Sequence, residues 1–111
     1  MANTADTSKS GHVMQITYSG TGADWNYLTD GGFIGAIKLA GIIWLPSGAN
    51  DVLVINEGGI DGPSIVHWKA TAITDTKQIV FSPPLRLRPY IDLTDCTYTD
   101  LTITKIIMLL A

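Results

Sequence analysis

The feature that most constrains the fold is an apolar run of fourteen residues, GFIGAIKLAGIIWL, at positions 32–45. A membrane-spanning helix needs about 20 apolar residues, whereas this run is shorter, carries Lys38 in its middle and is followed by Pro46. As a buried helix it would contain Gly35 and Gly41, each costing up to about 1 kcal/mol relative to alanine. We therefore predict a long β-strand that bends at Gly35 or Gly41, where the missing side chain permits a bulge.

Alternation along this strand assigns its side chains to two faces. One face is continuously apolar and is predicted to join the core; it carries Phe33, Ile37, Leu39, Ile43 and Leu45. The other face is mixed, with Lys38 near its middle and Ile42 and Trp44 toward its end. The run is thus typical of a strand at the centre of a sheet.

The composition of the whole chain agrees with a β-protein. Ile, Thr and Val make up 32 of the 111 residues. Nine of the ten acidic residues are Asp, which favours turns, whereas Glu favours helices. At this length the chain has room for one domain with one core. We expect an all-β domain with no substantial helix.

Turn signals divide the chain into seven or eight strands, as is typical of a single antiparallel β-sandwich or jelly-roll-like domain. The expected strands span residues 12–19, 32–45, 51–57, 64–73, 78–82, 85–91 and 101–111. Pro83 and Pro84 are expected to break the chain. The last strand is too apolar for a solvent-exposed edge, so we expect it to lie centrally or to be covered by another chain.

The inward phase of the strands predicts which residues form the core. In the first strand Met14, Ile16 and Tyr18 share one side. The predicted core of the sandwich consists of Ile37, Leu39, Ile43, Leu53, Ile55, Leu85, Leu87 and Ile103. Arg86 and Arg88 alternate with the leucines and are expected to point outward.

Residues 1–31 differ in composition from the sandwich expected at 32–111. We interpret them as a polar N-terminal arm and a long loop, with a strand at 12–18 as an option. Residues 1–11 hold too few apolar side chains to offset their ordering cost, which predicts a docking arm that orders on a partner. Trp25 and Tyr27 are the candidate interface residues. In the alternative, residues 12–18 form an edge strand and the two aromatic residues cover one end of the sandwich.

Charge and cysteine content exclude several classes of protein. The net charge is −3 and only two arginines are present, which argues against binding of nucleic acid by phosphate neutralisation. Cys96 is the single cysteine, so we expect a free or structural thiol without a disulfide or cysteine metal set. The polar N-terminus lacks the apolar core of a signal peptide or anchor, which predicts synthesis in the cytoplasm and no membrane association.

No group of residues has the pattern of an active site or a cofactor site. His67 lies between apolar neighbours in SIVHWKA and is expected to be a strand residue, and Ser64 lacks the G-x-S-x-G context of a nucleophile. The aspartates match no calcium-loop spacing and are expected to form turns and strand ends; they are Asp24, Asp30, Asp92, Asp95 and Asp100. We therefore predict no catalytic residue, no cofactor and no metal.

The middle of the chain resembles small virion proteins of tailed bacteriophages. The resemblance is carried by IKLAGIIWLPSGANDVLVINEGGIDGPSIVHWKA at 37–70, with Ile37, Trp44 and the Asp51–Gly58 strand and turn, and by the later LRLRPYID. It implies a non-enzymatic β-sandwich located in the virion. The expected role is a capsid decoration (cement) protein that binds the major capsid protein on the outside of the head, or a small neck or tail component. The polar N-terminal segment departs from shorter members of this group.

Two features add to this expectation, and two other classes of function stay open. Low charge density and the apolar last strand predict a homo-oligomer or binding to a multimeric partner. A carbohydrate-binding sandwich would use exposed Trp25, Tyr27 or Tyr98 as a stacking platform. A small β-fold enzyme would need a pocket with convergent polar groups around His67 or the aspartates.

Overall fold

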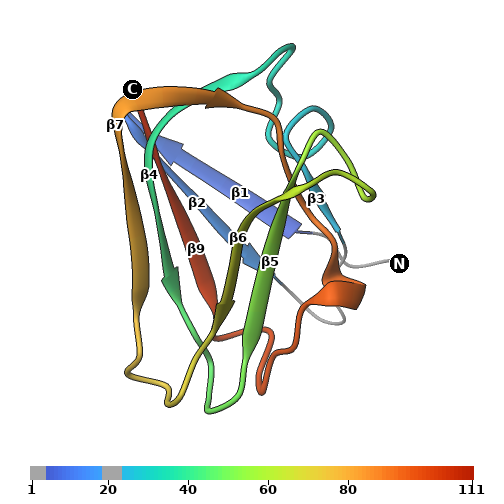
Figure 1. The fold of residues 1–111 in the computed structure, drawn as a ribbon, viewed down its shortest axis with the longest axis vertical. Helices are drawn as coiled ribbons and strands as arrows, with labels where there is room; N and C mark the ends of the chain where they lie inside the picture. The colour runs from blue at the N-terminus through green and yellow to red at the C-terminus, as the bar shows by residue number, and fades with distance from the viewer. Residues whose placement is uncertain (1–4, 19–23) are drawn as a thin grey trace.

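Two antiparallel sheets pack face to face in the computed structural model, which describes residues 5–18 and 24–111 (Figure 1). The five-stranded sheet has the order β1 (Ala5–Ser10), β2 (Val13–Tyr18), β9 (Lys105–Leu110), β4 (Ile37–Leu45) and β7 (Lys77–Leu87). The four-stranded sheet has the order β3 (Trp25–Asn26), β8 (Pro89–Ile91), β5 (Val52–Glu57) and β6 (Ser64–Lys69). One 3-10 turn, η1 (Leu93–Asp95), follows β8. The predicted all-β, sandwich-like class is confirmed, with nine strands in the described residues where seven or eight were expected.

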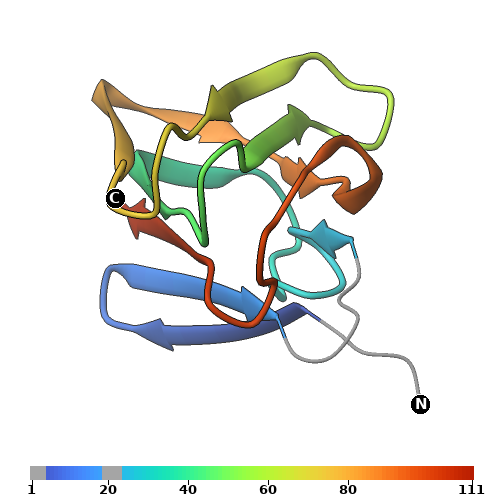
Figure 2. The same ribbon diagram turned by 90° about the horizontal axis from the view of Figure 1, so that it is seen from below.

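The core lies between the two sheets, which face each other in Figure 2. The predicted core residues Ile37, Leu39, Leu53 and Ile55 are buried. The shared side of the first strand is also confirmed: Met14, Ile16 and Tyr18 of β2 all point inward and are buried. Alternation of apolar residues therefore identified the correct inward phase wherever the strand runs without interruption.

The bend in the long apolar strand falls at Gly41, one of the two predicted positions. The register of β4 shifts between Leu39 and Gly41 against both neighbouring strands, β7 and β9. The shift inverts the alternation, because one extra residue moves every later side chain to the other face. Ile42 and Trp44 are consequently buried, and the prediction that Ile43 belongs to the core is wrong.

The two prolines interrupt the pairing of β7 but do not end the strand: β7 spans Lys77–Leu87, and its residues 81–84 have no partner in β4, where Leu39 pairs with Leu85 and Gly41 with Val80. It is an edge strand of the five-stranded sheet, and a residue that lacks N–H is tolerated on such an edge. Leu85 is 45% exposed and Leu87 only partly buried, so the prediction that Leu85 is a core residue is wrong. Among the described strands β7 pairs with β4 alone, which leaves its other flank uncovered.

The last strand is central, as predicted, because β9 pairs with β2 on one side and β4 on the other. It begins only at Lys105, after a turn, and Ile103 in this turn is 48% exposed, contrary to the prediction. Thr104 is buried instead. Its hydroxyl accepts a 2.9 Å hydrogen bond from Trp44 Nε1 and donates one of 2.8 Å to the Leu45 carbonyl, so the buried polar group is satisfied.

The described part of the N-terminal segment forms strands of both sheets, β1 and β2 in one and β3 in the other. Residues 5–18 form the hairpin of β1 and β2, with Ala5 paired to Tyr18 and both buried. The polar side chains of β1 are explained by its position, because β1 is an edge strand of the sheet and polar side chains on an edge strand face solvent. Residues 1–4, part of the predicted arm, and 19–23, part of the predicted loop, lie outside the described residues. No helix in the described part of the chain has the length and apolarity to cross a membrane.

Candidate functional site

The outer face of the five-stranded sheet carries aliphatic side chains in neighbouring strands. Residues paired across antiparallel strands share one face, and the register places Val13, Leu109, Gly41 and Val80 in one row across β2, β9, β4 and β7. The next row on this face is formed by Gln15, Ile107, Ile43 and Gln78. We call the aliphatic members of these rows the outer patch; they are Val13, Ile43, Val80, Ile107 and Leu109.

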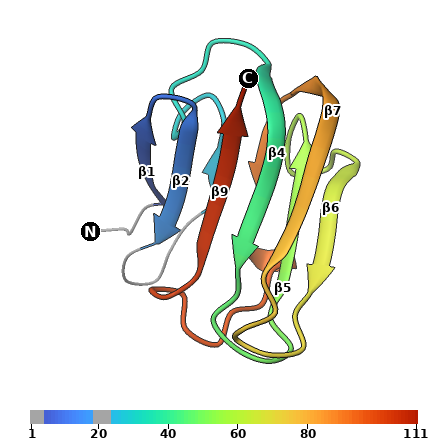
Figure 3. The ribbon, with the colours of Figure 1, turned by 90° about the vertical axis from the view of Figure 1, so that its left-hand side faces the viewer.

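No other segment of the described chain covers the outer face of the five-stranded sheet (Figure 3). Val80 is 70% exposed and Val13 42% exposed, and the three residues between them on the sheet are partly exposed. An antiparallel sheet with one solvated face usually carries polar residues there. Contiguous apolar surface on a soluble domain marks a place where another molecule binds.

Cations flank the outer patch on the same face. Lys38 of β4 lies directly opposite Arg86 of β7 at one end, and Lys105 of β9 lies at the other. All three are exposed, and no ion pair within the described residues involves them. An acidic residue, Asp6 of the edge strand β1, lies on the same face, opposite Thr17 of β2. The face therefore combines an apolar centre with a positively charged end formed by Lys38 and Arg86, the cation pair.

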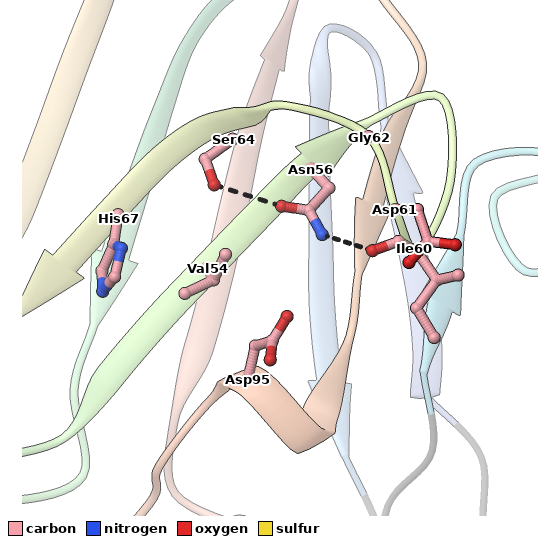
Figure 4. Close-up of a pocket in the computed structure, with 8 residues that line it drawn as sticks. All are labelled: Val54, Asn56, Ile60, Asp61, Gly62, Ser64, His67 and Asp95. Carbon is pink, nitrogen blue, oxygen red and sulfur yellow. Dashed lines mark hydrogen bonds between the residues drawn. The ribbon is translucent and has the colours of Figure 1, made fainter.

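The outer face of the other sheet contains an open hollow of about 390 Å³ (Figure 4). Strands β5 and β6 supply its floor, the loop between them one wall and η1 another; it is lined by Val54, Asn56, Ile60, Asp61, Gly62, Ser64, His67 and Asp95. Asn56 is buried and shapes this wall: its Nδ2 donates to the Ile60 carbonyl at 3.1 Å, and its Oδ1 accepts from Ser64 Oγ at 3.3 Å. Asp61 and Asp95 are exposed at the hollow.

The polar groups of the hollow do not form a catalytic arrangement. Ser64 Oγ donates to Asn56, and no hydrogen bond in the described residues joins His67 to Ser64 or Asp95. A nucleophile activated by a base requires such contacts. Within residues 5–18 and 24–111 no three His, Cys, Asp or Glu side chains converge as metal ligands. The hollow is therefore described best as an acidic depression with apolar side chains at Val54 and Ile60.

Of the two predicted interface residues, Trp25 is fully buried and is unavailable to a partner. Its Nε1 donates a 2.9 Å hydrogen bond to Thr7 Oγ1 of β1, and the close approach of Gly31 to its ring leaves no room for a Cβ there. Tyr27 is partly buried and packs against the core. Trp25 and Tyr27 thus close one end of the sandwich, as in the alternative considered from the sequence. The edge strand that this alternative expected at 12–18 is wrong, because β2 lies between β1 and β9.

The carbohydrate platform expected from exposed aromatic residues is not formed by these side chains. Trp25 is buried, and Tyr98 is partly buried against the core with its ring centroid 6.1 Å from that of Tyr18. Neither tyrosine hydroxyl has a hydrogen-bond partner in the described structure. Burial raises the pKa of both phenols well above the ordinary value. These tyrosines are therefore interior residues.

Four of the five predicted aspartates anchor turns and loops through their carboxylates, as expected: Asp24, Asp30, Asp92 and Asp100. Asp92 caps η1 by accepting hydrogen bonds from the Thr94 backbone and hydroxyl, and Asp24 accepts from Tyr90 Oη at 2.7 Å and from Leu93 N at 2.9 Å. The contact with Asp24 raises the pKa of Tyr90 to about 12. A further aspartate, Asp51, is fully buried, and its carboxylate connects two loops.

Cys96 lies beside β5 and contacts the core. Its thiol accepts a 3.3 Å hydrogen bond from Val54 N and donates one of 3.6 Å to the Val54 carbonyl. Burial raises the pKa of the Cys96 thiol above its ordinary value. A thiol held neutral is a weak nucleophile, in agreement with a structural role.

Sequence reasoning missed the outer patch, although part of its signal was present. The last strand is apolar at every position from Ile106 to Leu110, which indicates a strand covered on both faces. The contributions of Val13 and Val80 required the strand order, since these residues lie 67 positions apart in the chain. Comparison with protein-family models, with curated proteins and with solved structures finds no match to this chain.

Proposed function

We propose that this chain is a non-enzymatic structural protein of a tailed-bacteriophage virion, which binds the major capsid protein on the outside of the head and stabilises the head. The observation that carries the proposal is the outer patch, an aliphatic strip across four strands of an otherwise complete sandwich. Burying this surface against another protein is favourable by about 25 cal/mol per Å² of apolar area, before the cost of association. A protein that stays bound in a particle needs a surface of this kind.

The sequence resemblance supplies the second support, because the virion proteins to which residues 37–70 are similar are small assembly components. A neck or tail component uses the same kind of apolar contact and is the second candidate. The copy number in the particle separates the two roles. A decoration protein is present in numbers comparable with the major capsid protein, whereas a neck or tail component is present in far fewer copies.

The first test is quantitative mass spectrometry of purified particles of the phage whose genome encodes the chain. We expect the chain in particles that survive density-gradient purification, at a copy number comparable with that of the major capsid protein. Absence from such particles, together with its presence in the soluble fraction of the lysate, contradicts the proposal. A low, ring-like copy number assigns the chain to the neck or tail.

The second test measures particle stability. Particles made without the chain are expected to release their DNA at a lower temperature, and added wild-type chain is expected to restore the original temperature. Val80→Asp introduces a charge into the outer patch and is expected to restore it poorly. Ile73→Asp is the matched control, because Ile73 is 53% exposed in the turn after β6, outside the patch. Equal restoration by the two variants contradicts a role for the patch.

A further inference from the structure

The charges around the outer patch indicate the chemistry of the surface that covers it. Lys38 and Arg86 are directly opposite each other on neighbouring strands, an arrangement that is destabilising for like charges. No carboxylate within the described residues forms an ion pair with either. A surface that covers the patch is therefore favoured when it brings carboxylates to this end.

The chain itself carries a surface with that chemistry on its other sheet. The hollow presents the exposed carboxylates of Asp61 and Asp95, and neither takes part in an ion pair within the described residues. The hollow also presents two apolar side chains, Val54 in its floor and Ile60, which is 50% exposed (Figure 4). The hollow thus combines two negative charges with apolar side chains, which complements two positive charges beside an exposed valine.

We propose that the outer patch of one copy docks on the hollow of a second copy, with the cation pair against the two carboxylates and Val80 against Ile60. This inference rests on the proposed function and deepens it, because it names a second copy of the chain, itself part of the particle, as the protein that covers the outer patch. The two surfaces belong to different sheets, so the contact is heterologous. Repetition of such a contact closes into a ring or continues as a filament, depending on the rotation between copies.

Face-to-face docking of two outer patches is disfavoured by the same charges. That arrangement brings together the cation pairs and Lys105 of two copies, and opposed like charges cost several kcal/mol at an interface. The head-to-tail arrangement places opposite charges together and leaves both apolar surfaces covered. Its strength is expected to fall as salt is raised, since the charged groups lie at the rim of the contact.

The experiment is sedimentation analysis of the purified full-length chain over a range of protein and salt concentrations. We expect concentration-dependent self-association of the wild type that weakens with salt. Val80→Asp should weaken it by about a hundredfold or more, because a charge would be buried in the apolar centre. Lys38→Glu should weaken it by about tenfold. The matched control Ile73→Asp should associate like the wild type.

A mixing experiment distinguishes the head-to-tail contact from any symmetric one. In Val80→Asp the patch is blocked and the hollow is intact, whereas in the double variant Asp61→Lys/Asp95→Lys the hollow is blocked and the patch is intact. Each variant alone should be monomeric. An equimolar mixture should form a 1:1 dimer and nothing larger, because each pair retains one working contact. Thermal melts followed by circular dichroism check that all variants are folded.

Three outcomes overturn the inference. The first is a wild-type chain that stays monomeric at high concentration. If that monomer still binds phage heads, the outer patch is assigned to the capsid protein and not to a second copy. The second is self-association that Val80→Asp and Lys38→Glu leave unchanged. The third is a mixture of the two blocked variants that forms no dimer. Because these measurements use the isolated chain, they are independent of the particle experiments that decide the proposed function.

Discussion

The buried carboxylate of Asp51 provides the sharpest test of how this fold is held together. Asp51 is fully buried at the start of β5 and accepts four hydrogen bonds. Two come from Ser47, through its backbone N–H at 2.8 Å and its hydroxyl, and two come from Thr99, through its N–H at 2.9 Å and its hydroxyl at 2.7 Å. The carboxylate thereby connects the β4–β5 turn to the loop before β9.

We expect Asp51→Asn to lower the free energy of unfolding by about 2–4 kcal/mol. The amide can accept hydrogen bonds at only one of its two terminal atoms. Its NH₂ group therefore faces one backbone N–H, which is left unpaired, and one hydroxyl, which has to turn and give up its own donation to accept from the NH₂. A buried unpaired donor costs about 1–3 kcal/mol. For a chain of this length 1 kcal/mol corresponds to roughly 4 °C in melting temperature, so we expect a fall of about 8–16 °C.

Acid titration gives an independent measure of the same site. Burial alone raises the pKa of the Asp51 carboxyl, but the four hydrogen bonds from Ser47 and Thr99 outweigh it and hold the pKa below the ordinary value of 3.8. A carboxyl whose pKa is lowered by folding stabilises the protein above its ordinary pKa, and this contribution is lost as the pH falls through the folded-state pKa. The stability of Asp51→Asn should therefore depend less on pH below about pH 4 than that of the wild type.

The assay is urea unfolding followed by tryptophan fluorescence and circular dichroism, between pH 7 and the acid limit of solubility. Asp75→Asn is the matched control, because Asp75 accepts hydrogen bonds from the Thr71 backbone and hydroxyl in the same geometry but at the surface. Its effect should be much smaller. If Asp51→Asn is as stable as the control, and keeps the wild-type dependence on pH, the reasoning about this carboxylate is wrong.

Three further predictions test the bulge and the interior. Ile42→Ala should cost about 2–5 kcal/mol and Ile43→Ala clearly less, since only Ile42 is buried after the shift at Gly41; equal losses in urea unfolding would contradict the bulge. A Cβ at Gly41 would lie 2.7 Å from the Ile79 carbonyl oxygen, so Gly41→Ala should cost about 1–3 kcal/mol, while Gly35→Ala, with open space around it, should melt like the wild type. Cys96 should react slowly with a thiol reagent at pH 8 in the native protein and completely in denaturant; equal rates in both states refute its burial.

Strands β2 and β4 show why the pattern of one strand is a reliable guide only up to an irregularity. In β2 the alternation is unbroken, and Met14, Ile16 and Tyr18 point inward as expected. In β4 the sequence indicated a bend at Gly35 or Gly41 but not which of the two carries it. The choice of Gly41 depends on the pairing with β7 and β9, whose residues are far away in the chain. The position of the bulge determines which of the later side chains in β4 face the core, and Trp44 is one of them.

The sequence by itself determined the all-β class, the positions of most strands and the central place of the last one. These properties follow from local quantities: β-branched composition, turn residues and the alternation of apolar side chains. Alternation also fixed which residues of an uninterrupted strand share a face, because the side-chain period of a strand is two.

Only the tertiary structure decided which faces are covered. It placed polar β1 in the sheet, buried Trp25 beneath it, exposed Leu85 on the edge strand and joined Val13 to Val80 in the outer patch. It also brought Asp61, from the loop between β5 and β6, and Asp95, from η1, to one hollow. The physical reason is that burial depends on what lies across the neighbouring strand or sheet, which is set by pairing between segments distant in the chain. The local pattern of side chains carries no information about which distant segments pair.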